Sequence, residues 1–373
     1  MKKVLSLLLV ILVAGILTVG FLAVKRYASN PEQIVPLPFR FLVPAPAIKL
    51  EAPILIIGDR MGNYFGRFKA ELASVISSDL DRPIKIQSLA QDGQGLHRTL
   101  HQMRSINQWP QLLIYQGGSE EFGEKKFELS EIKKISVNFK RFKDERIETV
   151  LILYPWLSRL VYEPLKRVRL EETPVEFAVE SQVEYLRRLD TELMLYEEQL
   201  IQLVNLSKDR SSLLILATTP INLDIPPRSV CEFATTTELE TDIQQLRELL
   251  KANDPKGAYA RSSKLVGLHS GNAGLYYIHG QISKRLGYLE EAKANLLSAS
   301  AYDCDPWRTT EIQNAIIRKV ASNRRVLLFD FARLVENDWT LNQTFFDELH
   351  PQNLYYDKGM QQLGLVIKNI LKL

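Results

Sequence analysis

Short, nearly continuous apolar runs alternate with amphipathic stretches along most of this chain. Runs of this length are typical of strands buried on both faces of a sheet. They cover residues 53–58, 83–90, 111–117, 149–155, 212–219 and 325–331. Helical spacing is found in the intervening segments 64–80, about 175–207 and 357–373. The alternation predicts an α/β fold with a parallel sheet and helices on both faces, in which chemistry gathers at the carboxyl ends of the strands.

One block interrupts the alternation and is helical throughout. It covers residues 239 to about 303, and Ala258 and Ala292 lie 34 positions apart within it. The second half of the block resembles a tetratricopeptide repeat, with small or apolar residues at the expected positions Gly280, Gly287, Ala292, Leu296 and Ala299. Two repeats are too few to stand alone, so we expect them to pack on the α/β body as an insertion. A helical hairpin that only fills space is the alternative.

The N-terminal stretch from Val4 to Val24 has no charged residue and follows two lysines. A helix of this length can cross a bilayer. Lys25 and Arg26 follow at once, where a cleaved signal peptide would have a small-residue cleavage site, so we predict an uncleaved anchor at 4–24. The proline-rich residues 25–50 form a spacer, and residues 51–373 form the folded domain. We expect a single-pass protein of a bacterial inner membrane, with its domain in the periplasm or outside the cell.

Composition excludes some classes of partner. The formal net charge of the chain is only +3, with basic and acidic residues evenly mixed, which argues against nucleic acid. The two cysteines, Cys231 and Cys304, flank the helical block. In an exported chain they could form a disulfide that closes the base of the insertion, or they could be two buried free thiols.

Four short motifs fall at the ends of the predicted strands: "IIGDRMG" (56–62), "LAQDGQG" (89–95), "IYQGGSEEF" (114–122) and "FDELHPQ" (346–352). In order and spacing they resemble the SGNH (GDSL-type) hydrolases, especially a branch with an inserted tetratricopeptide segment. The stretches "TPINLDIPP" (219–227) and "DPWRTTEIQNAIIRKV" (305–320) resemble that branch too. The resemblance covers most of residues 51–373. It implies a flavodoxin-like three-layer sandwich with a parallel sheet.

The same resemblance implies an altered active site. Family members use a serine nucleophile, a histidine base held by an aspartate, and oxyanion donors that include a glycine and an asparagine. This chain keeps Asp347, His350 and the glycine Gly93, but Arg60 stands at the serine position and Glu120 at the asparagine position. A guanidinium cannot form an acyl intermediate, and a carboxylate repels an oxyanion. Because the two positions face each other in the family fold, we predict an ion pair between Arg60 and Glu120.

Other candidate residues carry weaker expectations. A shifted alignment would make Ser119, or less favourably Ser88, the nucleophile. Asp347 and His350 could in principle serve a metal or a proton transfer, but without a third ligand we expect a retained structural hydrogen bond, no metal site and no cofactor. His97 and His101 lack the glutamate of a zinc protease motif, and we expect them to be solvated surface residues. Arg308 is a candidate for holding an acidic ligand, with a packing role as the alternative.

These observations predict a membrane-anchored, extracytoplasmic SGNH-like protein that has lost acyl-transfer chemistry. It would bind an envelope glycan, an acylated ligand or a protein partner. The alternative is an active esterase or O-acyltransferase that acts on envelope polysaccharide or lipid esters through a displaced serine. A scaffold that uses only its repeat surface is a third possibility.

Overall fold

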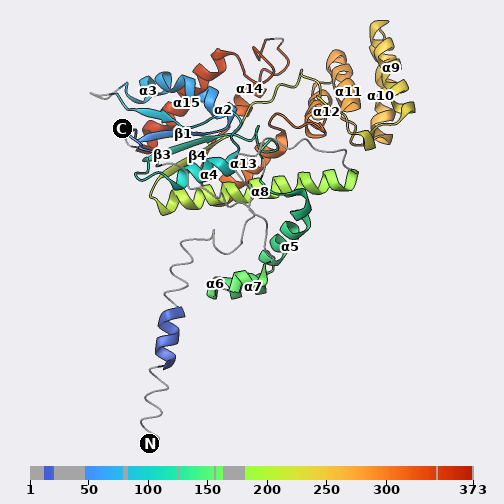
Figure 1. The fold of residues 1–373 in the computed structure, drawn as a ribbon. Helices are drawn as coiled ribbons and strands as arrows, with labels where there is room; N and C mark the ends of the chain where they lie inside the picture. The colour runs from blue at the N-terminus through green and yellow to red at the C-terminus, as the bar shows by residue number, and fades with distance from the viewer. Residues whose placement is uncertain are drawn as a thin grey trace, which may run out of the picture.

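A five-stranded, all-parallel sheet forms the centre of the folded part (Figure 1). The computed structural model describes residues 12–20, 47–78, 83–124, 126–154, 157–162, 181–341 and 343–371. The strands are β1 (Ile54–Gly58), β2 (Ile86–Ser88), β3 (Leu112–Gln116), β4 (Leu213–Ala217) and β5 (Leu327–Phe329). Their order, β2-β1-β3-β4-β5, is the flavodoxin-like order of doubly wound sheets, whose direction of growth reverses between β1 and β3.

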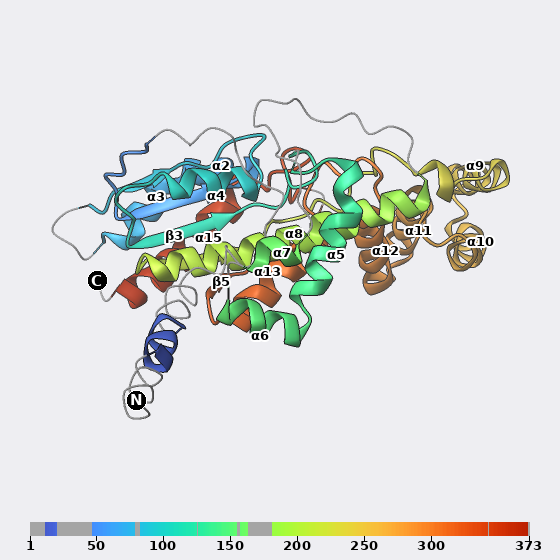
Figure 2. The ribbon, with the colours of Figure 1, turned by 60° about the horizontal axis from the view of Figure 1, so that its bottom comes forward.

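Alternate strand residues face two separate cores, which gives the three layers predicted from the sequence (Figures 1 and 2). Odd-numbered residues of β1 such as Leu55 pack on one face, and even-numbered ones such as Ile56 on the other. The first face is covered by α4 (Leu96–Arg104), α8 (Gln182–Asp209) and α13 (Glu311–Arg324). The second face is covered by α2 (Arg60–Phe65), α3 (Lys69–Ile76), α14 (Phe331–Glu336) and α15 (Asn353–Leu371).

The end of β1 is a tight junction that only glycine can occupy. Gly58 has φ of +141°, and a Cβ atom there would lie 1.7 Å from the carbonyl oxygen of Gln116 on β3. The chain then turns directly into α2, whose first amides are capped by Asp59. The predicted helix 64–80 is accordingly split, because α2 ends at Phe65 and a 3₁₀ turn (Gly66–Phe68) precedes α3. This junction places residues 59 and 60 at the carboxyl end of the sheet.

The block at 239–303 is helical, as predicted. It consists of α9 (Thr237–Lys251), α10 (Pro255–Leu268), α11 (Ala273–Leu286) and α12 (Leu289–Ala301), which stack at the end of the molecule away from the C-terminus (Figure 1). Gly280 lets α11 approach α12 closely, since a Cβ atom there would lie 2.7 Å from the side chain of Leu296. The assignment of these helices to the tetratricopeptide class stays a prediction.

A buried polar network holds three of these helices together. His279 on α11 lies 2.8 Å from Ser262 Oγ on α10 through Nδ1, and 3.0 Å from Glu291 Oε1 on α12 through Nε2. The hydroxyl of Tyr259 donates to the same carboxylate at 2.8 Å. Ser262 is completely buried, so this serine–histidine–glutamate arrangement is closed to substrates. We assign it a structural role.

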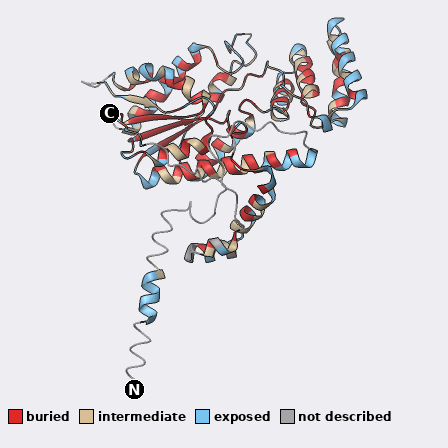
Figure 3. Cartoon of the chain, viewed as in Figure 1, coloured by how far each residue is buried: buried red, intermediate tan, exposed pale blue. Residues whose placement is uncertain are grey.

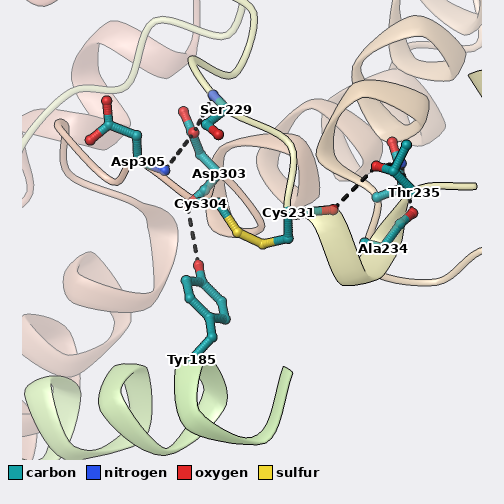
Figure 4. Close-up of a disulfide and its surroundings, with 9 residues drawn as sticks. Tyr185, Ser229, Cys231, Ala234, Thr235, Asp303, Cys304 and Asp305 are labelled. Carbon is teal, nitrogen blue, oxygen red and sulfur yellow. Dashed lines mark hydrogen bonds between the residues drawn. A yellow bond between two sulfur atoms is a disulfide. The ribbon is translucent and has the colours of Figure 1, made fainter. Parts of the chain in front are cut away.

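Cys231 and Cys304 form a disulfide at the base of the insertion, with Cα atoms 5.3 Å apart (Figure 4). Of the two readings left open by the sequence, the disulfide is the one found. Next to it, Asp303 accepts hydrogen bonds from the backbone amides of Arg228 and Ser229 at 2.8 and 3.0 Å. The segment that enters the insertion (residues 228–231) and the segment that leaves it (residues 303–304) are therefore joined by a covalent bond and by hydrogen bonds.

The predicted strand at 149–155 is wrong. Residues up to Leu153 belong to α6 (Glu145–Leu153), which Asp144 caps, and α6 forms an arm with α5 (Ile132–Phe142) and α7 (Ser158–Val161) beside α8 (Figure 2). Ile147 and Leu151 pack there in a small cluster with Phe142, at helical spacing. A short apolar run fits a strand and a helix equally well, and the local contacts decide between them.

Most of the predicted anchor and spacer, residues 4–24 and 25–50, lies outside the described residues. Residues 12–20 are described and form an exposed helix (Figure 3). Within the described residues, no helix combines the length and the apolar character needed to cross a bilayer. Ile48 and Leu50, which fall in the predicted spacer, belong to the fold, since Ile48 bridges to Ile106 and Leu50 is buried in the core. The boundary near Glu51 stays a prediction.

Breaking the disulfide tests how strongly it fastens the insertion. The bond closes a loop with a sequence separation of 73, which corresponds to about 4 kcal/mol in the chain-entropy account. We expect Cys231→Ser, Cys304→Ser or the double variant to lower the free energy of unfolding by about that amount, measured by urea denaturation. The wild type in reductant should match the variants. Equal stability of oxidised and reduced protein would contradict the expectation.

Candidate functional site

The carboxylate of Asp59 joins the two loops that leave β1 and β3. Its Oδ1 accepts the amide of Met61 at 2.8 Å. Its Oδ2 accepts the amide and the hydroxyl of Ser119 at 2.6 and 2.8 Å, and the amide of Glu120 at 3.2 Å. Burial raises the pKa of Asp59 to about 6, although the hydrogen bonds from Ser119 and Met61 oppose this. The side chain is fully enclosed and fixes the positions of residues 60 and 120.

Arg60 and Glu120 form the predicted ion pair. Arg60 Nε donates to Glu120 Oε1 at 2.7 Å, and a second guanidinium nitrogen contacts the same oxygen. The side chain of Arg60 is 34% exposed and that of Glu120 is 12% exposed. Both guanidinium contacts therefore go to one oxygen, and the two-oxygen, bidentate form of the pair is not adopted. The pair lies where the loops that follow β1 and β3 meet.

Asp347 and His350 form the retained pair. The ring atom Nδ1 of His350 lies 2.8 Å from Asp347 Oδ2, and Asp347 Oδ1 accepts the amides of Leu349 and His350 at 2.8 and 2.6 Å. Burial of the carboxyl is the largest single influence and opposes ionisation, but the hydrogen bonds from His350 and Leu349 outweigh it and lower the pKa of Asp347. Tyr64 on α2 covers the imidazole, with ring centroids 4.2 Å apart.

Among the described residues, no hydroxyl group forms a hydrogen bond with Nε2 of His350. With Nδ1 facing the carboxylate, Nε2 is the atom available to accept a proton, and it has no hydrogen-bond partner among the described residues. Ser119 instead donates its hydroxyl to Asp59. Among the described residues, no hydrogen bond or ion pair connects His350 with Arg60, Ser119 or Ser88. The alternative nucleophile Ser119 is near Asp59 and is not paired with the base.

Gly93 and Arg308 occupy different parts of the site. Gly93 lies in the exposed turn before α4 with φ of +71°, and the neighbouring Asp92 accepts from Asn63 on α2 at 2.9 Å. Arg308 is buried, with 4% exposure, and lines a small cavity together with Ser119 and residues of the loop after β4. It therefore lies inside the site, beneath the surface, and not at its mouth.

A buried charge cluster behind the site was not anticipated from the sequence. Lys126 is fully buried and its ammonium contacts Glu121 and, at 3.5 Å, Glu192 on α8. Glu121 and Glu124 also accept the first amides of α4, from Leu96 at 2.8 Å and from His97 and Arg98 at 3.2 and 3.0 Å. The charge run "EEFGEKK" has the composition of a solvated loop. It can be buried because Lys126 pairs with Glu121 and Glu192, while Glu121 and Glu124 satisfy the first amides of α4.

The expectation that His97 is a solvated surface residue is wrong. His97 is only 4% exposed, and His101 is partly buried on the same face of α4. Burial lowers the pKa of His97 well below its ordinary value, and nearby cations, Lys126 foremost, act in the same direction. Spacing alone could not reveal this, because the burial of His97 depends on residues distant in sequence such as Glu124 and Lys126.

Comparisons with known proteins leave the chain without an assigned family. Neither the protein-family models nor the curated proteins yield a match. Among solved structures, a GDSL-like lipase from Bacteroides thetaiotaomicron is similar with a TM-score of 0.32 and 11% identity, covering 93% of this chain and 98% of that one. A protein from Bacteroides fragilis assigned as an acylhydrolase has a TM-score of 0.34 and 11% identity, covering 93% and 96%. Likenesses this distant decide neither fold nor function.

A double-mutant cycle tests the ion pair. Arg60→Met and Glu120→Gln each remove one charge, and each alone leaves the other group without its partner. Because Arg60 is 34% exposed, we expect a coupling of about 1 kcal/mol between the two changes, measured by urea denaturation of the four proteins. Additive effects would show that the contact contributes nothing measurable to stability.

The buried carboxyl Glu124 predicts a pH dependence. Burial, together with Glu121, raises its pKa from 4.5 to about 8, although Lys126 and Arg98 oppose this. The folded chain thus holds a proton that the unfolded chain releases, so this contribution is complete below about pH 4.5 and is lost as the pH rises through about 8. We expect Glu124→Gln to reduce the fall in melting temperature over that interval.

The matched control is Glu248→Gln, which changes an exposed glutamate of α9. It should leave the pH profile of the melting temperature unchanged. Parallel profiles for wild type and Glu124→Gln would mean that Glu124 is ionised in the folded protein at neutral pH.

Proposed function

We propose that this protein is an extracytoplasmic, membrane-anchored pseudo-hydrolase, similar to the SGNH hydrolases in shape but acting by binding. The observation that carries the proposal is the Arg60–Glu120 ion pair at the positions where the resembled family has its nucleophile and an oxyanion donor. A guanidinium cannot attack an acyl carbonyl, and loss of one oxyanion donor alone removes about 3 kcal/mol of transition-state stabilisation. The charges of Arg60 and Glu120 neutralise each other, so neither is left unpaired and the shape of the cleft is kept.

The retained Asp347–His350 pair does not restore turnover. A base needs a nucleophile within hydrogen-bond reach, and Nε2 of His350 has none among the described residues. An activated water would still lack the donor at position 120, because the Glu120 carboxylate accepts hydrogen bonds from Arg60 and has none to give an oxyanion. The role of Asp347 and His350 is then structural. Asp347 also accepts hydrogen bonds from the backbone amides of Leu349 and His350 and so fixes the turn.

Location and ligand class follow from other features. The apolar segment 4–24 would anchor the chain, with the domain outside the cytoplasm of a bacterial cell. The Cys231–Cys304 disulfide supports an oxidising compartment. The ligand in the cleft would be an envelope glycan or an acylated component that is held and not cleaved. The helices α9–α12 add a separate surface for a protein partner, as repeat-like insertions do.

An active esterase or acyltransferase is the second candidate. Ser119 lines the same cavity as Arg308, and the Asp347–His350 pair is intact. For catalysis the Ser119 hydroxyl would have to leave Asp59, to which it donates at 2.8 Å. This movement would remove one of the bonds that join the two loops.

A fluorophosphonate probe separates the two candidates. We expect no labelling of the full-length protein, because the probe reacts only with an activated serine. The double variant Arg60→Ser with Glu120→Asn restores the residue types of the resembled family at both positions. We expect this variant to be labelled, and His350→Ala within it to abolish the labelling. Wild-type labelling that disappears in Ser119→Ala would overturn the proposed function.

A further inference from the structure

An open hollow lies on the surface of the insertion, between α10 and the start of α12. It has a volume of about 480 Å³ and is lined by Tyr259, Tyr288, Leu289, Glu290 and Glu291. Binding sites in proteins typically have volumes of about 300–1,000 Å³. The hollow therefore has room for a long side chain and for the peptide backbone next to it.

One part of the hollow is aromatic and apolar. The rings of Tyr259 and Tyr288 meet edge to face, with centroids 5.2 Å apart and an angle of 67° between their planes. Tyr288 is 50% exposed and the adjacent Leu289 is 43% exposed. Neighbouring exposed apolar side chains in a hollow are typical of contact surfaces. A tyrosine face attracts a cation, and it also packs against the alkyl stem of a lysine or an arginine.

The other part of the hollow is acidic. Glu291 Oε2 accepts the hydroxyl of Tyr259 at 2.8 Å, and its Oε1 lies 3.0 Å from Nε2 of His279, so this carboxylate is held in place before any ligand arrives. Glu290 is exposed and forms no ion pair among the described residues. In the same part of the chain, no lysine or arginine lines the hollow. Negative charge beside a tyrosine ring is complementary to a cation.

We propose that this hollow binds a lysine or arginine side chain from a basic peptide segment of a protein partner. The cationic group would lie between the Glu290 carboxylate and the Tyr288 ring, with its alkyl stem against Leu289. The inference rests on the proposed function, because it names the chemistry of the partner for the surface formed by α9–α12. A small cation alone would fill only part of the hollow and leave Leu289 exposed, whereas a peptide covers both. An acidic partner would be repelled by the two carboxylates.

The test is a fluorescence anisotropy titration of the full-length protein at constant ionic strength. The probe is a short dye-labelled peptide that alternates lysine with alanine. Its competitors are the unlabelled peptide, the corresponding peptide of glutamate and alanine, and tetramethylammonium chloride. We expect the basic peptide to bind and to be displaced by its unlabelled form. The acidic peptide should not compete, and tetramethylammonium should compete only at much higher concentration.

Two exposed side chains can be changed with little effect on the fold. Glu290→Gln removes a charge at the surface, and Tyr288→Ala removes a half-exposed ring that makes no capping hydrogen bond to α12. Each change should weaken binding of the basic peptide by about two- to fivefold, the usual effect of losing an exposed ion pair or a cation–π contact. The double variant should lose about tenfold.

The insertion also offers matched controls. Glu240→Gln removes an exposed glutamate from the first turn of α9, just as Glu290→Gln does in α12. Leu268→Ala removes a large apolar side chain of α10 that is 77% exposed and does not line the hollow. Both variants should bind the basic peptide as the wild type does.

Three results would overturn the inference: no binding of the basic peptide, binding that the double variant retains in full, or competition by the acidic peptide or by tetramethylammonium as strong as that by the basic peptide. Failure here is distinct from failure of the proposed function, because fluorophosphonate labelling reports on the cleft and peptide binding on the insertion. A protein that is labelled and also binds the basic peptide through Tyr288 and Glu290 would contradict the function and support this site.

Discussion

The arrangement of the site depends on one enclosed carboxylate. Asp59 accepts four hydrogen bonds, one from the first turn of α2 and three from residues 119 and 120 beyond β3. Gly58 and Gln116 bring those two strand ends so close that no larger residue fits between them. Without an acceptor at this point, three amides and a hydroxyl would be buried unpaired. The positions of Arg60, Glu120 and Ser119 all follow from this single group.

The same constraint explains why two opposite charges can face each other where the loops after β1 and β3 meet. The backbone at positions 60 and 120 is fixed by Asp59, so the side chains there meet whatever their chemistry. A lone arginine or a lone glutamate in this half-buried place would lack compensation, whereas the pair satisfies both.

The sequence predicted the sheet and the contact between Arg60 and Glu120 well, because both depend on local patterns at strand ends. It placed five strands correctly and predicted the contact between Arg60 and Glu120. It wrongly assigned 149–155 to a strand, because a short apolar run does not show which parts of the fold it will pack against. The burial of Lys126 with Glu121, Glu124 and Glu192 was hidden for a related reason. Charged residues are expected in solvent, and only the three-dimensional placement of α4 and α8 reveals that their loop is covered.

The position of the disulfide has a consequence for how the chain reaches its native state. β4 and β5 are neighbours in the sheet, yet the whole insertion lies between them in sequence. Contacts between residues so distant along a chain form slowly, because the intervening segment must first be confined. Helices α9–α12 contact mainly their neighbours in sequence, which favours early assembly. The disulfide between Cys231 and Cys304 joins the two ends of the insertion, so it shortens the chain path that must be confined before β5 can pair with β4.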